Sequence, residues 1–254
     1  MKEQQYEIIK EFKKIANKKW IKGVNNTTNS VGLTFESLID KKPDSMYFPD
    51  YNGLEIKCSQ RYSKYPIKLF SLSFDGPNLY EMNRLLELYG LPDEIYKEKK
   101  QLQGQIKINE YERINDNYFK LKVDKKSKKI LISIYDLNKQ LIEEKTYIEL
   151  ETIKSRLELK LSNLAMVYAS KKIIDNNLYF RYYLITIYKL KSFETFLKLL
   201  ENNYIKVEII GRVARSGIEK GRQRNKNLVF SLPKEYIDLL FEKQIEYNND
   251  LNNF

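Results

Sequence analysis

The sequence contains no histidine and a single cysteine among its 254 residues. Without histidine, the chain cannot form a Ser-His-Asp or Cys-His catalytic triad or the HExxH zinc site of metalloproteases. One cysteine cannot form an internal disulfide or a cysteine-rich zinc site. No run reaches the roughly 18 uncharged apolar residues that a membrane span requires, and the charged start, MKEQQYEIIKEFKK, lacks the apolar core of a secretory signal. These absences predict a soluble cytoplasmic protein with no membrane partner.

Acidic residues are fewer than basic ones, 34 against 45, which gives a net charge of +11. This balance favours a polyanionic partner such as DNA or RNA. It also fits a lysine-rich surface encoded by an AT-rich genome. The placement of the charge along the chain has to decide between these two explanations. Apolar residues make up 42% of the chain, too many for a disordered protein.

Apolar spacing along the chain alternates between helical and strand periods, which predicts a mixed α/β fold. We expect helices at residues 2–18, 31–39 (capped by Ser30), 78–89, 148–161, 193–200 and 233–247. We expect strands at 54–59, 67–74, 119–123, 130–135, 164–174, 178–190, 204–210 and 228–232. The polar stretch 93–104 is the best candidate for a domain boundary or an excursion.

The stretch YFPDYNGLEIKCSQR, residues 47–61, carries the chemically informative residues. Glu55 and Lys57 are two apart on an expected strand, so their side chains share one face. Asp50 precedes that strand, where the chain can turn it back toward the same face. Two carboxylates and an ammonium would then meet, which suits Mg²⁺-assisted hydrolysis of a phosphodiester without any histidine. The alternative is a Pro-Asp turn and a solvated Glu-x-Lys strand that arose by chance.

Glu36 is the only ionisable residue between Lys22 and Asp40, on the otherwise uncharged segment VGLTFESLI. Taken alone, it fits an ordinary solvent-facing helix glutamate.

The order GLTFESLI (32–39), PD (49–50) and GLEIKCSQR (53–61) resembles the PD-(D/E)XK nucleases. More closely, it is similar to the MvaI/BcnI-like restriction endonucleases, in the branch that also contains the mismatch-repair nickase MutH. The resemblance is good over residues 31–77 and loose over 163–241. Residues 91–160 match nothing in this pattern.

The resemblance implies a restriction-endonuclease-like mixed central sheet flanked by helices, with two lobes that form a DNA cleft. Asp50 and Glu55 would hold Mg²⁺, or Mn²⁺ as a substitute, together with the backbone carbonyl of Ile56. Lys57 would be the catalytic lysine and Glu36 an accessory acid. Arg61, at the end of the strand, would meet the DNA backbone.

A basic loop, residues 211–227, reads GRVARSGIEKGRQRNKN. Its arginines can form the bidentate fork that recognises guanine in the major groove. The candidate DNA-binding residues here are Arg212, Arg215, Arg222, Arg224 and Lys226. The alternative is a solvated hairpin loop that binds DNA unspecifically. Lys226 stands where the related pattern carries a histidine, so the target sequence stays open.

The expected organisation has a catalytic core at 1–90, completed by part of 163–254, an insertion of unclear role at 91–160, and a recognition lobe at 163–254 with the basic loop. The resemblance implies a site-specific type II restriction endonuclease that works as a monomer and nicks the two strands of duplex DNA in turn, with a cognate DNA methyltransferase as genetic partner. Two alternatives remain, a MutH-like strand-specific nickase and a non-catalytic DNA-binding protein on a nuclease scaffold.

Overall fold

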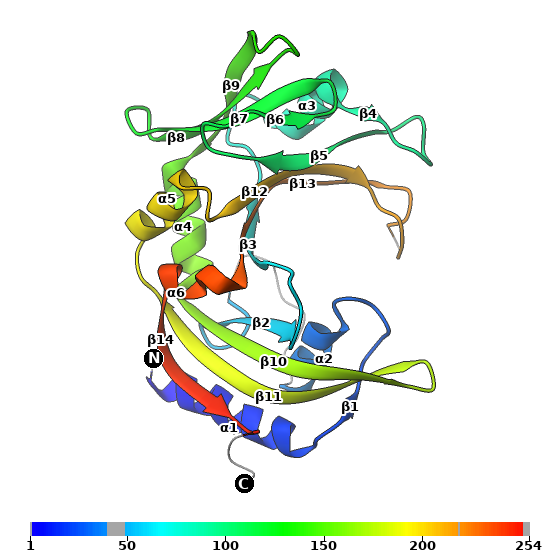
Figure 1. Cartoon of the computed structure of the whole chain (residues 1–254), viewed down its shortest axis with the longest axis vertical. Coiled ribbons are helices and arrows are strands. Elements are labelled where there is room, and N and C mark those ends of the chain that lie inside the picture. Colours follow the sequence, from blue (N-terminus) through cyan, green and yellow to red (C-terminus); the bar gives the residue numbers. More distant parts are fainter. Residues whose placement is uncertain (1, 40–48, 218, 251–254) are drawn as a thin grey trace. The chain divides into compact units, whose positions relative to one another are not determined.

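The computed structural model describes residues 2–39, 49–217 and 219–250 (Figure 1). The chain divides into two compact units. The first comprises Met1–Tyr65, Arg156–Ser192 and Ile237–Phe254, and the second comprises Pro66–Ser155 and Phe193–Tyr236. These boundaries differ from those expected at residues 90 and 163. The units are defined by how the backbone packs and not by function. The roles expected for residues 1–90, 91–160 and 163–254 therefore stay predictions.

A curved five-stranded sheet forms the first unit (Figure 1). Its strands are β1 (Ile21–Lys22), β2 (Glu55–Gln60), β10 (Asn163–Ile174), β11 (Asn177–Leu190) and β14 (Phe241–Asn248). Strands β10 and β11 are antiparallel, and Asp175 and Asn176 between them have φ angles of 47° and 59°, as the tight turn of a hairpin requires. Strand β2 runs parallel to β10, so the sheet is mixed.

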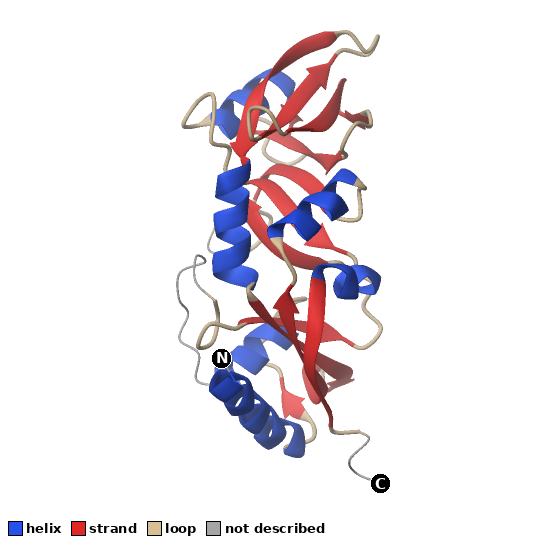
Figure 2. Cartoon of the chain, turned by 90° about the vertical axis from the view of Figure 1, so that its left-hand side faces the viewer, coloured by secondary structure: helices blue, strands red, loops and turns tan. Residues whose placement is uncertain are grey.

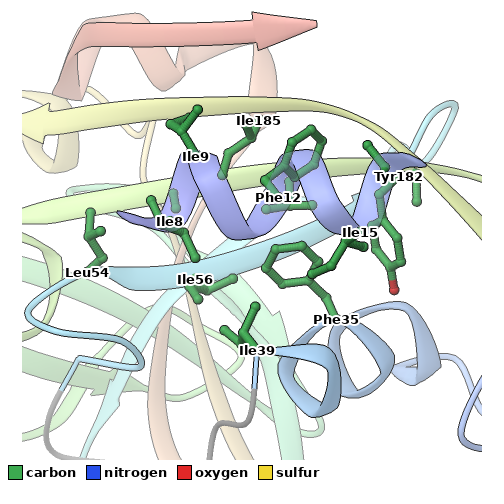
Figure 3. Packing of buried hydrophobic residues seen from close by; sticks show 14 of the residues in the cluster. Ile8, Ile9, Phe12, Ile15, Phe35, Ile39, Leu54, Ile56, Tyr182 and Ile185 are labelled. Atoms are coloured by element: carbon green, nitrogen blue, oxygen red, sulfur yellow. The ribbon is translucent and has the colours of Figure 1, made fainter. Parts of the chain in front are cut away.

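Helices α1 (Lys2–Asn17) and α2 (Ser30–Leu38) contribute to the core of the first unit. Figure 3 shows Phe12 of α1, Phe35 of α2 and Tyr182 of β11 gathered beside the strands. All three side chains are fully buried. The Tyr182 hydroxyl donates a hydrogen bond of 2.7 Å to the carbonyl of Val31, which ties α2 to the sheet. Ile56 of β2 lies in the same core.

Two antiparallel sheets form most of the second unit. The five-stranded sheet has the order β3 (Ile67–Leu72), β13 (Gln223–Leu232), β12 (Lys206–Val213), β5 (Lys100–Ile106) and β4 (Leu91–Pro92). The four-stranded sheet runs in chain order through β6 (Glu112–Ile114), β7 (Asn117–Asp124), β8 (Lys129–Tyr135) and β9 (Leu141–Glu149). Helices α3 (Glu81–Tyr89) and α5 (Phe193–Glu201) accompany these sheets, and α4 (Leu150–Leu161) contributes residues to both units.

Helices occur among the strands in both units (Figure 2), which confirms the mixed α/β class. The helices predicted at 2–18, 78–89 and 193–200 are confirmed to within a few residues. The strands predicted at 119–123 and 130–135, and at 164–174 and 178–190, are also confirmed, and each pair forms an antiparallel hairpin. Among the described residues, no helix is long and apolar enough to cross a membrane.

The helix predicted at 233–247 is wrong. A short 3-10 turn, η1 (Lys234–Tyr236), and α6 (Ile237–Leu240) lead into strand β14, which pairs with β11. Pairing with β11 satisfies backbone groups that would otherwise lie open at the edge of the sheet, and this tertiary gain exceeds the local preference for helix.

Three smaller details differ between expectation and structure. Ser30 is the first residue of α2 rather than its cap, and its hydroxyl donates to the carbonyl of Asn25 at 2.6 Å. The helix predicted at 148–161 is confirmed as α4, although residues 148 and 149 still belong to β9. The polar stretch 93–104, expected to be a boundary or an excursion, holds no boundary between the units and leads into β5, which pairs with β12 inside the sheet.

Candidate active site

Strand β2 separates its side chains as the period of two predicts. Ile56 is buried, and Ile56 and Cys58 pack against the core below α2. Glu55 and Lys57 project from the other face, and the Lys57 ammonium donates a hydrogen bond to Glu55 Oε1. The sequence therefore placed this acid and this base together correctly.

A tight turn brings Asp50 back to the start of the same strand. Tyr51 and Leu54 exchange two backbone hydrogen bonds of 2.9 and 2.8 Å. Between them, Asn52 and Gly53 have φ angles of 43° and 82°, the left-handed conformation for which Asn-Gly pairs are favoured in two-residue hairpin turns. Asp50 Oδ2 accepts a hydrogen bond of 2.9 Å from the backbone N–H of Ile56. The carboxylates of residues 50 and 55 thus lie at one end of β2.

Glu55 is a buried carboxylate whose two oxygens have different surroundings. Its side chain is 1% exposed, and Oε1 forms ion pairs with Lys57 and Lys160. The Nζ of Lys160 lies 3.4 Å from this oxygen. Oε2 is buried and accepts no hydrogen bond from any described residue. Burial raises the pKa of Glu55, and Asp50 raises it further, whereas Lys57 and Lys160 lower it. A buried oxygen without a partner is costly, and a bound cation would remove that cost.

Glu36 projects from α2 toward β2. A β-carbon built on Gly32, one turn earlier on α2, would lie 3.9 Å from Glu36 Oε1 and 4.0 Å from the β-carbon of Cys58. Burial raises the pKa of the Cys58 thiol, and the charge of Glu36 adds to this effect. The carboxylate of Glu36, predicted to be an accessory acid, therefore lies beside the face of β2 opposite to Glu55.

Lys57 is joined to Glu55 by a direct hydrogen bond, and Asp50 is held next to them by the backbone N–H of Ile56. Glu36 lies near Cys58 instead, close enough for its charge to act on that thiol. Among the residues that the structure describes, no three Asp, Glu or Cys side chains form a group that could hold a metal ion. A metal site here would have to combine two carboxylates with other oxygens, such as the carbonyl of Ile56.

Lys160 is a site residue that the sequence reasoning missed. It lies in the last turn of α4 and its side chain is 14% exposed. Its neighbours on the helix, Leu157 and Leu161, are fully buried. In the sequence, the signal for Lys160 was a lysine next to the apolar positions of a helix. Its partner, Glu55, lies far away along the chain.

Arg61 follows directly after β2. Its backbone N–H donates to the carbonyl of Ala169 at 3.0 Å, which continues the pairing with β10. Its guanidinium lies over the rings of Tyr183 and Tyr62, at 5.2 and 5.7 Å from their centroids. Tyr62 is 85% exposed, so this stacked cation borders the protein surface in the first unit.

The basic loop belongs to the second unit and is shorter than predicted. Strands β12 and β13 extend into it, and Arg212 stands directly opposite Arg224 in their antiparallel register. Both arginines are exposed, as is Arg222. Like charges opposite each other destabilise a sheet unless an anion offsets them. Burial lowers the pKa of Lys226, and Arg224 and Arg212 lower it further, which shows how positive this hairpin is.

Arg215 has a partner within the protein. Its Nη1 and Nη2 donate to Oδ1 and Oδ2 of Asp93, each at 2.7 Å. The sequence did not suggest this ion pair, because the two residues lie on separate connections.

A sequence model of the MvaI/BcnI restriction endonuclease family matches residues 9–241 of the chain. The chain belongs to this family. The match includes residues 91–160, which the sequence pattern could not place. No curated protein matches the chain. The relation to MutH stays a prediction.

Solved structures of a restriction endonuclease resemble the chain. A complex of the restriction endonuclease MvaI with its cognate DNA substrate has a TM-score of 0.88 at 23% identity, and MvaI in the absence of DNA has a TM-score of 0.60 at 24% identity. Each comparison covers 96% of this chain and 98% of the other. These similarities show the restriction-endonuclease-like fold, and family membership supports DNA endonuclease activity.

Proposed function

We propose that this chain is a site-specific type II restriction endonuclease that hydrolyses phosphodiester bonds of double-stranded DNA with Mg²⁺. One observation carries the chemistry: the buried Glu55 carboxylate, with one oxygen lacking a partner, lies beside Asp50 and two lysines at the end of β2. Membership of the MvaI/BcnI family supports the choice of DNA as the substrate.

The donor set suits a hard divalent cation. Asp50, Glu55 and the carbonyl of Ile56 supply oxygens only, which are the ligands that Mg²⁺ and Mn²⁺ prefer. The Glu55 oxygen without a partner is the position that such an ion would satisfy. When bound, the ion would lower the pKa of a water molecule and offset the negative charge that develops on the phosphate.

Lys57 is the residue we assign to the reacting groups. Its side chain is 27% exposed, so the ammonium is accessible from solvent while it holds Glu55. In this position it can orient the attacking water and stabilise charge on the phosphate oxygens. The Ile56 N–H keeps Asp50 at the strand end. Glu36 acts as an accessory acid from α2.

The basic loop is the part of the chain that we assign to the recognition of base edges. The unfavourable pairing of Arg212 with Arg224 would be relieved by a polyanion. Arg222 and Arg224 are exposed and can reach into a groove, where a guanidinium takes guanine O6 and N7 together. Arg61 and Lys226 would contact phosphates, which position the protein without reading sequence.

Several finer points belong to the same proposal. The enzyme works as a monomer in the cytoplasm, nicks one strand and then the other, and has a cognate methyltransferase that protects the host site. The solved complex of MvaI with cognate DNA is the structural precedent for duplex binding by this fold.

The deciding test uses Asp50→Asn and Lys57→Ala, with Lys171→Ala as a control because that lysine is exposed on β10. Supercoiled plasmids of varied sequence are incubated with Mg²⁺, and all new ends are sequenced. We expect the unaltered protein and the control to give open circles, then linear DNA, with ends at one short site. The two site variants should cut at least about 10³-fold more slowly, yet still bind cognate duplex in Ca²⁺.

A product that stops at open circles would replace this proposal with a strand-specific nickase. Binding of duplex without any cleavage in Mg²⁺ or Mn²⁺ would identify a non-catalytic DNA-binding protein. Cleavage that survives Asp50→Asn would move the active site elsewhere.

A further inference from the structure

The connection between β4 and β5 forms an anchor for the basic loop within the second unit. We name residues 93–99 the anchor loop. Asp93 has no exposed surface, and its carboxylate accepts the two hydrogen bonds of 2.7 Å from Arg215. The same carboxylate accepts hydrogen bonds from the backbone N–H groups of Ile95 and Tyr96, at 3.0 and 2.9 Å. One buried side chain therefore organises the anchor loop and holds the basic loop against it.

A second set of contacts joins the two loops near Gly221. The Lys99 ammonium donates to the Gly221 carbonyl. Gly221 has a φ of 82°, and a β-carbon there would lie 3.2 Å from the Tyr96 ring. The glycine thus provides both a left-handed turn and a close approach that a larger residue would block. The anchor loop thus holds the basic loop at Arg215 and again at Gly221.

Hydrogen bonds inside the basic loop complete its ordering. The Ala214 N–H donates to the Arg222 carbonyl at 2.9 Å, and the Gly221 N–H donates to the Ala214 carbonyl at 2.8 Å. The side chains of Arg222 and Arg224 remain exposed. Arg215 is therefore paired with the anchor loop, whereas the side chains of the neighbouring arginines are exposed to a partner.

Charge keeps this contact intact at ordinary pH. Hydrogen bonds from Arg215 lower the pKa of Asp93 to about 2, although burial acts in the opposite direction. The backbone N–H groups of Tyr96 and Ile95 lower this pKa further. The carboxylate is thus ionised at neutral pH, and a planar guanidinium matches it in two parallel bonds. A loop ordered before binding loses less conformational entropy when it meets its partner.

We propose that Asp93 is a positioning residue for site selection: through Arg215 it holds the basic loop in the conformation that presents Arg222 and Arg224 to base edges. This inference rests on the proposed function, because it assigns a role to the loop that reads DNA. Arg215 is then a structural member of the loop rather than a contact to DNA.

The test compares Asp93→Asn with Asp124→Asn. Asp124 also organises a turn of the second unit, where it accepts hydrogen bonds from the Lys126 N–H at 3.1 Å and the Ser127 hydroxyl at 2.6 Å. Its turn joins β7 to β8, away in sequence from both loops, and its pKa is also lowered, mainly by Ser127. The two variants therefore make the same chemical change at turn-forming aspartates, of which only Asp93 is buried and holds the basic loop.

Two measurements are made on each full-length variant. Amide hydrogen exchange without DNA should be faster at residues 214–222 in Asp93→Asn and unchanged there in Asp124→Asn. The ratio of kcat/KM for the cognate duplex to that for a duplex with one altered base pair should fall about 10-fold or more in Asp93→Asn, with the loss in KM. Asp124→Asn should keep the ratio of the unaltered protein.

A third variant, Arg215→Lys, covers the case in which Asp93→Asn fails to fold. It keeps the charge on an exposed side chain but loses the two-pronged bond, so it should reproduce the faster exchange and the lost discrimination. Unchanged exchange and discrimination in both variants would overturn the positioning role. If the unaltered protein discriminates between duplexes, only this inference has then failed, whereas an unaltered protein that selects no site refutes the proposed function itself.

Discussion

At the scale of single residues, the active site depends on how one carboxylate is compensated. Glu55 is 1% exposed, yet it lies within reach of two ammonium groups and a second carboxylate. Burial and Asp50 make its charged form less favourable, and the two lysines make it more favourable. Both lysines act on Oε1, which leaves Oε2 for a ligand. This asymmetry is the feature on which the proposed cation site rests.

We expect Lys160→Met to tighten the binding of Ca²⁺ several-fold, because it removes a positive charge about 3.4 Å from a ligand oxygen and electrostatic repulsion at that range amounts to about 1 kcal/mol or more. Methionine keeps most of the buried stem. Calorimetric titration with Ca²⁺ measures the effect without any cleavage step.

Lys171→Met is the matched control, since that lysine of β10 is exposed and should leave the Ca²⁺ affinity unchanged. Equal affinities in the unaltered protein and Lys160→Met would show that Lys160 does not act on the ion site.

At the scale of secondary-structure elements, the position of α2 depends on a small number of buried contacts. Phe35 packs against Phe12 and Tyr182, with ring centroids 6.3 and 5.2 Å apart. The Tyr182 hydroxyl reaches the carbonyl of Val31 in the first turn of α2. This helix carries Glu36 and packs on β2, so its placement fixes the distance between Glu36 and the strand of the candidate site.

Tyr182→Phe should lower the free energy of unfolding by about 1–2 kcal/mol, because it removes a buried hydrogen bond between β11 and α2. Urea denaturation followed by the fluorescence of Trp20, which belongs to the first unit, measures the change. Tyr62→Phe removes a hydroxyl from a side chain that is 85% exposed and should have no effect. A similar loss in both variants would contradict the assigned hydrogen bond.

At the scale of the whole molecule, an ion-pair network should make the second compact unit sensitive to acid. In the second unit, Glu81 is buried, and Arg84 bridges Glu81 and Glu143, with 2.7 Å between Arg84 Nη2 and Glu143 Oε1. Burial raises the pKa of Glu81, but hydrogen bonds from Arg84, Thr146 and Asn78 outweigh it, so the pKa lies below its ordinary value of 4.5.

A lowered pKa means that the folded state holds the proton less tightly than the unfolded chain. The stabilisation by Glu81 is therefore complete above its ordinary pKa of 4.5 and is lost as the pH falls through the lower folded value. We expect hydrogen exchange of peptides from the second unit to accelerate as the pH falls below 4.5, relative to the intrinsic rate at each pH.

Glu81→Gln should remove most of this acid sensitivity and cost about 2–3 kcal/mol near pH 7, where the charged hydrogen bonds are intact. Glu110→Gln, on a side chain 54% exposed, is the control and should retain the sensitivity of the unaltered protein. An acid response that is identical in all three proteins would rule out the Glu81 network as its source.

The sequence by itself determined the features that depend on neighbouring residues. Alternation along 54–59 predicted that Glu55 and Lys57 share a face, and the Asn52-Gly53 pair supplied the turn that returns Asp50 to them. Both effects are local, since the strand period and the left-handed conformation of these turn residues act over a few residues. The motif order also pointed to the family that the comparison shows.

The tertiary structure alone decided which distant segments meet. Lys160 of α4 forms an ion pair with Glu55, and Arg215 forms one with Asp93. Residues 241–248 form a strand because they pair with β11. None of these pairings has a local signature, because each is set by the burial of charge or backbone groups against a partner far away in the chain. Local chemistry thus fixed the acids and the lysine of the motif, and long-range packing fixed what surrounds and positions them.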